Sequence, residues 1–245
     1  MLRPFALHQP TSAQAASALL ADLGEEARLY AGGTELLLAM KTGLLAPGHL
    51  IDVKQIPGIA AIGLAEDRVL RIGAAATHQQ IEDNRLVREH FPVLAELEGK
   101  IANVRVRGTG TLGGNLSFAE PHADPGALLL VHEARVRLES AGVRELPVDE
   151  FFVGTFEVAA APDEVLTRID VPPLPHRSGA AYERFVTLEW PSVGVAAGVT
   201  LSEDGCAIAE ARIGIGCVGP RPVRAPAAEA RLAGIGVEEL PGLLS

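Results

Sequence analysis

A chain of 245 residues with 48% hydrophobic residues and a formal charge of −10 is too apolar to be disordered, and long enough for one large domain or two small ones. Its 26 glycines and 17 prolines exceed average usage and indicate many turns. Acidic residues outnumber basic ones by 31 to 21 and no basic block occurs, which excludes nucleic acid and an anionic membrane surface as partners.

The first 55 residues alternate short apolar runs with helical periodicity. We expect strands at 5–7, 27–31 and 50–53, separated by a helix at 11–23 that starts at a Thr11/Gln14 capping box and a helix at 35–41 that is capped by Thr34. Strands that alternate with helices are typical of parallel sheets. The sequence therefore predicts a small parallel βαβαβ subdomain over about 1–55.

The pattern changes over 56–172, where hairpins and longer loops dominate. We expect strands at 59–64, 69–74, 135–139, 143–147 and 165–171, with helices starting at Thr77, near 90–99 and at 126–131. No helix is expected over the glycine-rich stretch 108–115. This second subdomain is predicted to be a mainly antiparallel sheet with helices on one face.

The proline cluster at 172–175 is the predicted boundary between a domain at 1–172 and a C-terminal domain at 173–245. Beyond it, period-two alternation predicts strands at 181–187, 193–201 and 206–217, followed by a helix at 226–233. The C-terminal domain is therefore expected to be a three-stranded antiparallel meander plus a helix. The predicted fold class is α+β.

Membrane, metal and cluster chemistry have little support in the residues. No apolar run approaches the ~20 residues that span a bilayer and no signal-peptide pattern opens the chain, so a cytoplasmic protein without membrane contact is expected. The seven histidines show no metal-ligand spacing, and no metal site is predicted. Cys206 and Cys217 cannot supply the four thiolates of an iron–sulfur cluster, so any cluster must lie in another chain.

Two segments, 108–113 and 214–219, match G-x-G-x-x-G. A dinucleotide fingerprint needs a strand before it and a helix that begins at it, and neither segment meets this expectation. Glycine turns can nevertheless hold a phosphate with successive backbone N–H groups. The turns 31–35 and 111–115 are candidates of this kind. Taken alone, each is better explained as an ordinary turn or cap, but two such turns in one acidic chain favour an anion site. Asp124 is likewise open, as the N-cap of the 126–131 helix or as a ligand group.

Taken together, segments 31–37, 107–115 and 121–124 resemble the FAD-binding (medium) flavoprotein subunit of the molybdenum hydroxylases, the family of xanthine dehydrogenase, carbon monoxide dehydrogenase and 4-hydroxybenzoyl-CoA reductase. The resemblance implies non-covalently bound FAD in a vanillyl-alcohol-oxidase-type fold, and no catalytic residue. It implies that FAD is bound at Ala31, Gly32, Gly33, Thr34, Glu35, Leu36, Thr111, Gly113, Gly114, Asn115, Asp124, Leu166 and Arg184.

The resemblance also implies partners. Electrons would come from a [2Fe–2S] subunit that is fed by a molybdopterin-binding subunit, and would leave to an acceptor such as NAD or oxygen. Three departures concern the C-terminal part: Arg184 stands where the family often has a lysine near the flavin, segment 188–190 replaces a basic pair that is usual in the family, and the domain at 173–245 is expected to be a shortened one. Two alternatives stay open, a stand-alone flavin oxidoreductase of the same fold and a non-catalytic binding or assembly protein.

Overall fold

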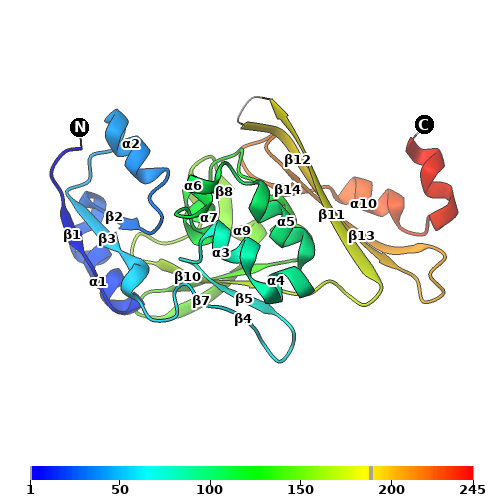
Figure 1. Ribbon diagram of the computed structural model, residues 1–245, viewed down its shortest axis with the longest axis horizontal. Coiled ribbons are helices and arrows are strands. Elements are labelled where there is room, and N and C mark those ends of the chain that lie inside the picture. The colour runs from blue at the N-terminus through cyan, green and yellow to red at the C-terminus, as the bar shows by residue number, and fades with distance from the viewer. Residues whose placement is uncertain (1, 188–189, 245) are drawn as a thin grey trace.

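A small parallel sheet lies at one end of the molecule, which a computed structural model describes for residues 2–187 and 190–244 (Figure 1). Its strand order is β1-β3-β2, with β1 (Ala6–His8), β2 (Ala27–Tyr30) and β3 (His49–Asp52). Helices α1 (Ala13–Leu23) and α2 (Leu36–Thr42) follow β1 and β2. The predicted βαβαβ unit is confirmed, and the carboxyl ends of β2 and β3 lie side by side.

Both helix caps predicted for this unit are wrong. Helix α1 is capped by Ser12, whose hydroxyl accepts the Ala15 N–H at 3.1 Å, and not by Thr11. Serine caps a helix at least as well as threonine, so the T-x-x-Q pattern alone could not show whether Thr11 or its neighbour Ser12 is the N-cap. Helix α2 has Glu35 at its N-cap without a side-chain cap bond. Its first helical hydrogen bond, from the Leu37 N–H, already reaches back to the Gly33 carbonyl at 3.0 Å.

The middle of the chain builds a five-stranded antiparallel sheet in the order β4-β5-β10-β6-β7. The strands are β4 (Ile62–Leu64), β5 (Leu70–Gly73), β6 (Arg135–Glu139), β7 (Val143–Pro147) and β10 (Val165–Val171). A separate two-stranded ribbon joins β8 (Phe152–Gly154) to β9 (Glu157–Val158). The predicted antiparallel subdomain is confirmed, and three of its strands have the predicted bounds.

Seven helices of the described chain belong to this middle part, and Figure 1 shows them gathered beside the sheet. They are α3 (His78–Asp83), α4 (Arg85–His90), α5 (Pro92–Lys100), α6 (Val104–Arg107), α7 (Leu112–Phe118), α8 (Pro125–Val131) and α9 (Val148–Phe151). Helices α4, α6, α7 and α9 were not expected, because these short segments show no clear apolar periodicity of their own. Leucines of α7 and α8 are buried in the core, and α7 packs against β10 of this sheet.

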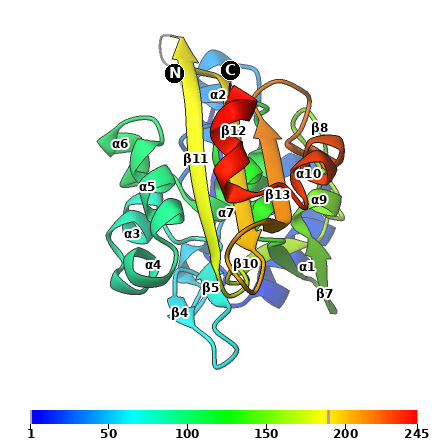
Figure 2. The same ribbon diagram turned by 90° about the vertical axis from the view of Figure 1, so that its right-hand side faces the viewer.

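A second antiparallel sheet forms the other end of the molecule (Figures 1 and 2). Its order is β11-β12-β13-β14, with β11 (Ser178–Thr187), β12 (Trp190–Leu201), β13 (Ile208–Gly216) and β14 (Val223–Arg224). The predicted three-stranded meander is therefore one strand short, since two-residue β14 is too brief to show alternation. Helix α10 (Pro226–Leu232) confirms the predicted helix, and a 3₁₀ segment (Val237–Leu244) follows it.

The second G-x-G-x-x-G segment is a packing feature. A Cβ on Gly214 would overlap the Ala127 carbonyl oxygen, and one on Gly216 would lie 3.5 Å from the Ala127 side chain. Strand β13 thus lies directly against helix α8, which only glycine permits at this distance. No helix begins at this described segment, whose first three residues end β13, so the exclusion of a dinucleotide fingerprint at 214–219 holds.

Candidate functional site

The first glycine turn leaves β2 and enters α2. Gly33 has φ +72°, and a Cβ there would overlap the Tyr30 ring, so only glycine fits. The amide groups of Gly32, Gly33, Thr34 and Glu35 have no acceptor among the described residues. A run of free N–H groups in a tight turn forms a concave donor surface that suits an anion.

The second glycine turn, with the three residues Gly108, Thr109 and Gly110 that precede it, leads from α6 into α7. Thr111 caps α7, since its hydroxyl accepts the Gly114 N–H at 3.1 Å. A short helix therefore does begin at this turn, against expectation. A helix, α6, precedes it in place of a strand, so the exclusion of a Rossmann fingerprint still holds.

Most amides of the second turn are used inside the protein. The N–H groups of Leu112 and Gly113 donate to Ala76 and Ala74 at 3.1 and 2.9 Å, and that of Asn115 donates to Thr111 at 2.9 Å. In contrast, the Asn115 Oδ1 atom is buried without a partner in the described part of the chain. The second turn thus offers fewer free backbone donors than the sequence predicts.

The two turns touch, although about 80 positions separate them. A Cβ on Gly32 would overlap the Thr109 carbonyl oxygen and lie 2.7 Å from Gly110 Cα. One on Gly110 would lie 3.4 Å from the Thr34 hydroxyl. The structure therefore brings together the two segments that the sequence singled out.

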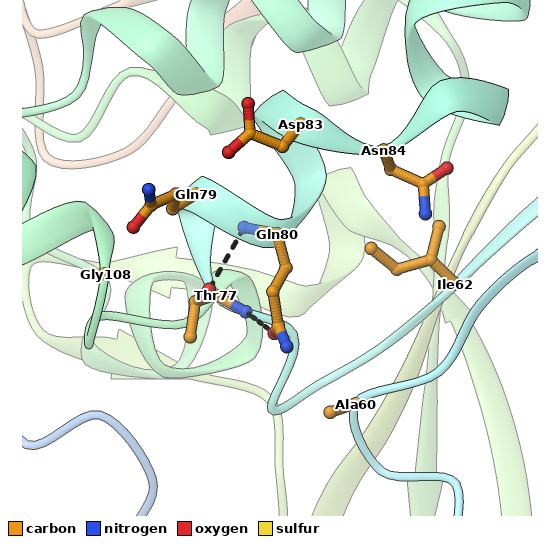
Figure 3. A pocket seen from close by; sticks show the side chains of 8 residues that line it. All are labelled: Ala60, Ile62, Thr77, Gln79, Gln80, Asp83, Asn84 and Gly108. Atoms are coloured by element: carbon orange, nitrogen blue, oxygen red, sulfur yellow. Dashed lines mark hydrogen bonds between the residues drawn. The ribbon is translucent and has the colours of Figure 1, made fainter.

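A pocket of about 540 Å³ opens beside the second turn, between Gly108 and the start of α3 (Figure 3). Thr77 and Gln80 form the predicted capping box there, with reciprocal bonds of 3.1 and 2.9 Å. Thr77 also bridges Thr111 across the two segments. The confirmed capping box thus fixes the backbone on which the second turn rests.

Lys54 supports the first turn, a role that sequence reasoning missed. Its ammonium donates to the Ala31 carbonyl at 2.9 Å, pairs with Asp52 at 2.8 Å and lies 3.9 Å from the centroid of the Tyr30 ring. The available signal was topological, because Lys54 follows a parallel strand whose carboxyl end must lie beside the first turn.

Glu35 and Leu36, the last predicted residues of the first turn, are half-buried. Burial raises the pKa of the Glu35 carboxyl, and the nearby Glu120 carboxylate raises it further. Glu120 in turn bonds the His122 ring at 2.7 Å. Glu120 therefore lies close enough to the first turn to act on Glu35.

Asp124 anchors a buried polar cluster and does not cap α8, so the cap interpretation is wrong. Its carboxylate accepts the Tyr182 hydroxyl at 2.5 Å and an Arg184 N–H at 2.6 Å. A second Arg184 N–H donates to the Lys100 carbonyl at 2.5 Å. Burial and Asp124 raise the pKa of the Tyr182 phenol, so Tyr182 stays the donor. The same two causes raise the pKa of the Cys217 thiol to about 12.

The remaining predicted residues lie elsewhere around this region. Leu166 is buried on β10 opposite Leu138, with no polar role. Gly113 is buried against Ala74, whose carbonyl oxygen would lie 2.6 Å from a Cβ at position 113. Leu188 and Glu189, part of the departure from the family pattern, lie outside the described residues.

Comparison with known families assigns both ends of the chain. A family model described as the FAD binding domain in molybdopterin dehydrogenase matches residues 3–174. The CO dehydrogenase flavoprotein C-terminal domain matches residues 181–239. The chain belongs to the family of FAD-binding medium subunits of molybdenum hydroxylases.

Relatives of this medium subunit share most of its length. The carbon monoxide dehydrogenase medium chain of Hydrogenophaga pseudoflava is 36% identical over 94% of this chain and 80% of its own. The putative xanthine dehydrogenase FAD-binding subunit of Escherichia coli K12 is 31% identical over 91% and 77%. A structure of carbon monoxide dehydrogenase from H. pseudoflava superposes with a TM-score of 0.92, at 36% identity over 96% and 82%. Quinoline 2-oxidoreductase from Pseudomonas putida 86 gives 0.90, at 28% identity over 98% and 83%.

The cofactor of this oxidoreductase subunit is FAD. The residues at the two turns fit it, because an anionic diphosphate requires donors and the first turn offers four free amides in an acidic chain. The buried, unpartnered Asn115 Oδ1 is an acceptor that a ligand hydroxyl or amino group would satisfy. Over the described residues, no cluster of three or more metal-ligating side chains occurs, and none of the helices there is long and apolar enough to cross a membrane.

Proposed function

We propose that this subunit carries electrons between an iron–sulfur partner and an external acceptor, with FAD held between the two glycine turns and the Asp124 cluster. The contact of Gly32 with Thr109 and Gly110 carries the proposal, because it sets the turn with the free amides directly against the second glycine turn. When bound, FAD supplies the redox chemistry, since it accepts electrons singly and releases them in pairs. The protein contributes binding and orientation.

The chain's own residues then have distinct tasks. Amides of Gly32 to Glu35 donate to the diphosphate, with Ala31 and Leu36 flanking them. Thr111, Gly113 and Gly114 shape the facing turn, and the Asn115 Oδ1 accepts from the cofactor. Asp124 and Arg184 orient the ribityl side, and Leu166 lends apolar surface near the isoalloxazine. Arg184 stands where the family often has lysine and keeps the positive charge.

The partners follow from the family to which the chain belongs. A separate [2Fe–2S] subunit would bring electrons to the flavin and a molybdopterin-binding subunit would supply them, and the two cysteines of this chain are too few to hold such a cluster themselves. The acceptor is an external molecule such as NAD or oxygen, and the complex works in the cytoplasm. The boundary between the two domains lies at the proline cluster 172–175.

The test is FAD titration of the purified, flavin-free subunit, followed by isolation of the complex from cells that express it with its neighbouring genes. We expect stoichiometric FAD binding and co-purification of iron and molybdenum. Failure of the chain to bind FAD would contradict the proposal and favour the non-catalytic binding or assembly protein. A chain that reduces an acceptor with a small substrate and no partner would be the stand-alone oxidoreductase.

Placement of the cofactor is tested separately with Gly33→Val, because a side chain at position 33 would overlap the Tyr30 ring. We expect loss of FAD retention while the far-UV circular dichroism of the whole chain stays close to that of the parent protein. Gly142→Val is the matched control, since position 142 has open space around it. Full FAD retention by Gly33→Val would contradict the placement.

A further inference from the structure

A buried histidine–glutamate pair lies behind the second glycine turn. His78 begins α3 and Glu98 lies in α5, and their Nδ1 and Oε2 atoms are 2.6 Å apart. Their side chains are 3% and 0% exposed. The other carboxylate oxygen of Glu98, Oε1, is buried with no partner in the described part of the chain. No step of the function proposed above uses either residue.

Such a pair is a poor device for stability alone. Burying a carboxylate is costly, and apolar residues of similar volume in place of a buried ion pair often leave stability unchanged or raise it. The unpartnered Oε1 adds a further cost, since a buried acceptor without a donor loses its hydrogen bonds to water and gains none from the protein. What such a pair does supply is a fixed geometry for the groups it contacts.

The group that His78 contacts is Gly110 of the second turn. The backbone N–H of His78 donates to the Gly110 carbonyl at 3.1 Å. The Cδ2 atom of the His78 ring would lie 3.3 Å from a Cβ at position 110. Nδ1 and Cδ2 flank Cγ on opposite edges of the imidazole, so the ring lies between Glu98 and the turn. Gly110 in turn lies against Gly32 of the first turn. One ring therefore separates Glu98 from the contact between the two turns.

The same end of α5 also reaches the other half of the site. Two residues after Glu98, the Lys100 carbonyl accepts a hydrogen bond from Arg184, which pairs with Asp124. The last turn of α5 is thus tied to the glycine turns through His78 and to the Asp124 cluster through Arg184. A shift of Glu98 would move both connections.

We propose that His78 and Glu98 are positioning residues. This buried pair holds Gly110, at the start of the second glycine turn, against Gly32 in the spacing that FAD requires. The inference rests on the proposed placement of FAD between the turns. Neither residue touches the cofactor. The pair acts through Gly110, which the His78 ring contacts.

The test compares FAD dissociation constants of four flavin-free forms. His78→Leu alone leaves Glu98 buried without a partner and is expected to fold poorly. The decisive variant is therefore the double change His78→Leu with Glu98→Leu, which removes both polar partners. We expect it to fold with an unchanged or higher Tm and to bind FAD roughly tenfold or more weakly. His78→Asn, whose amide reproduces the Nδ1–H donor, is expected to restore most of the affinity.

A matched control removes an ion pair that has no contact with the turns. Arg85 and Glu89 pair at 2.7 Å on exposed helix α4, and their replacement by leucine is expected to leave FAD binding unchanged. Wild-type affinity of the His78→Leu/Glu98→Leu form would overturn the positioning role, as would a failure of His78→Asn to rescue. If Gly33→Val also binds FAD normally, the placement of FAD between the turns fails first, so the two failures are distinguishable.

Discussion

Gly32 lies so close to Thr109 that a single methyl group at position 32 would overlap the Thr109 carbonyl oxygen and approach Gly110 Cα to 2.7 Å. The obstacle is backbone on both counts, so no side chain can turn away to make room. The contact therefore depends on glycine at position 32, and it fixes the distance between the two turns.

Gly32→Ala should push the two turns apart. Overpacking of this kind costs about 1–3 kcal/mol, and we expect that cost to appear as FAD binding weakened by roughly tenfold or more. Fluorescence titration of flavin-free protein measures it. Gly142→Ala is the control, because a Cβ at position 142 meets nothing within 4 Å. Equal affinities of the two variants would argue against the contact.

Gly214→Ala should have the opposite profile. A Cβ at position 214 would overlap the Ala127 carbonyl oxygen, which separates β13 from helix α8. We expect a loss of about 1–3 kcal/mol in the free energy of unfolding, with normal FAD affinity of the folded fraction. Urea unfolding measures the loss, and Gly179→Ala, in open space on β11, is the control. A stable variant that loses FAD would mean that the second glycine motif belongs to the cofactor site.

The two motifs show what glycine patterns reveal in a sequence. Spacing alone could not distinguish the 108–113 and 214–219 segments, since both need glycine for close backbone approach. The context of neighbouring elements excluded a dinucleotide fingerprint correctly, although α7 does begin at Thr111. The strands and the parallel unit were predictable because their periodicity is local. Some very short elements, such as two-residue β14 and four-residue α6, were not.

Asp124 shows where local reasoning stops. An aspartate before a proline and an apolar run satisfies every rule for an N-cap. Its carboxylate instead bonds Tyr182 and Arg184, 58 and 60 positions further along the chain. A bond to a phenol and a guanidinium outcompetes a cap, but only the tertiary fold brings those groups within reach. Lys54 is a different case, because the predicted parallel unit already placed it beside the first glycine turn.

Tyr182→Phe should destabilise the protein by about 1.5–3 kcal/mol, the range for a hydrogen bond to a charged group. The variant removes the 2.5 Å bond to Asp124 and leaves one carboxylate oxygen without its donor, while Arg184 holds the other. Urea unfolding measures the loss. Tyr30→Phe is a matched control, because the Tyr30 hydroxyl has no hydrogen bond within the described residues. Equal losses for both variants would show that the Asp124 cluster contributes nothing.

Glu35→Gln should stabilise the protein at neutral pH and not at acid pH. Burial and Glu120 raise the pKa of Glu35 above its ordinary 4.5, so the folded protein takes up a proton more readily than the unfolded chain. The stability that the protonated carboxyl contributes is complete below 4.5 and is lost as the pH rises through the folded pKa. Glutamine stays neutral throughout and retains that stability.

The difference in Tm between Glu35→Gln and the parent chain should therefore be close to zero at about pH 4 and positive at about pH 7. Differential scanning fluorimetry at both pH values measures it, without FAD so that binding does not contribute. Glu66→Gln, on an exposed turn, controls for the loss of one negative charge. A difference that is constant with pH, or negative at neutral pH, would mean that Glu35 is not strained by its burial beside Glu120.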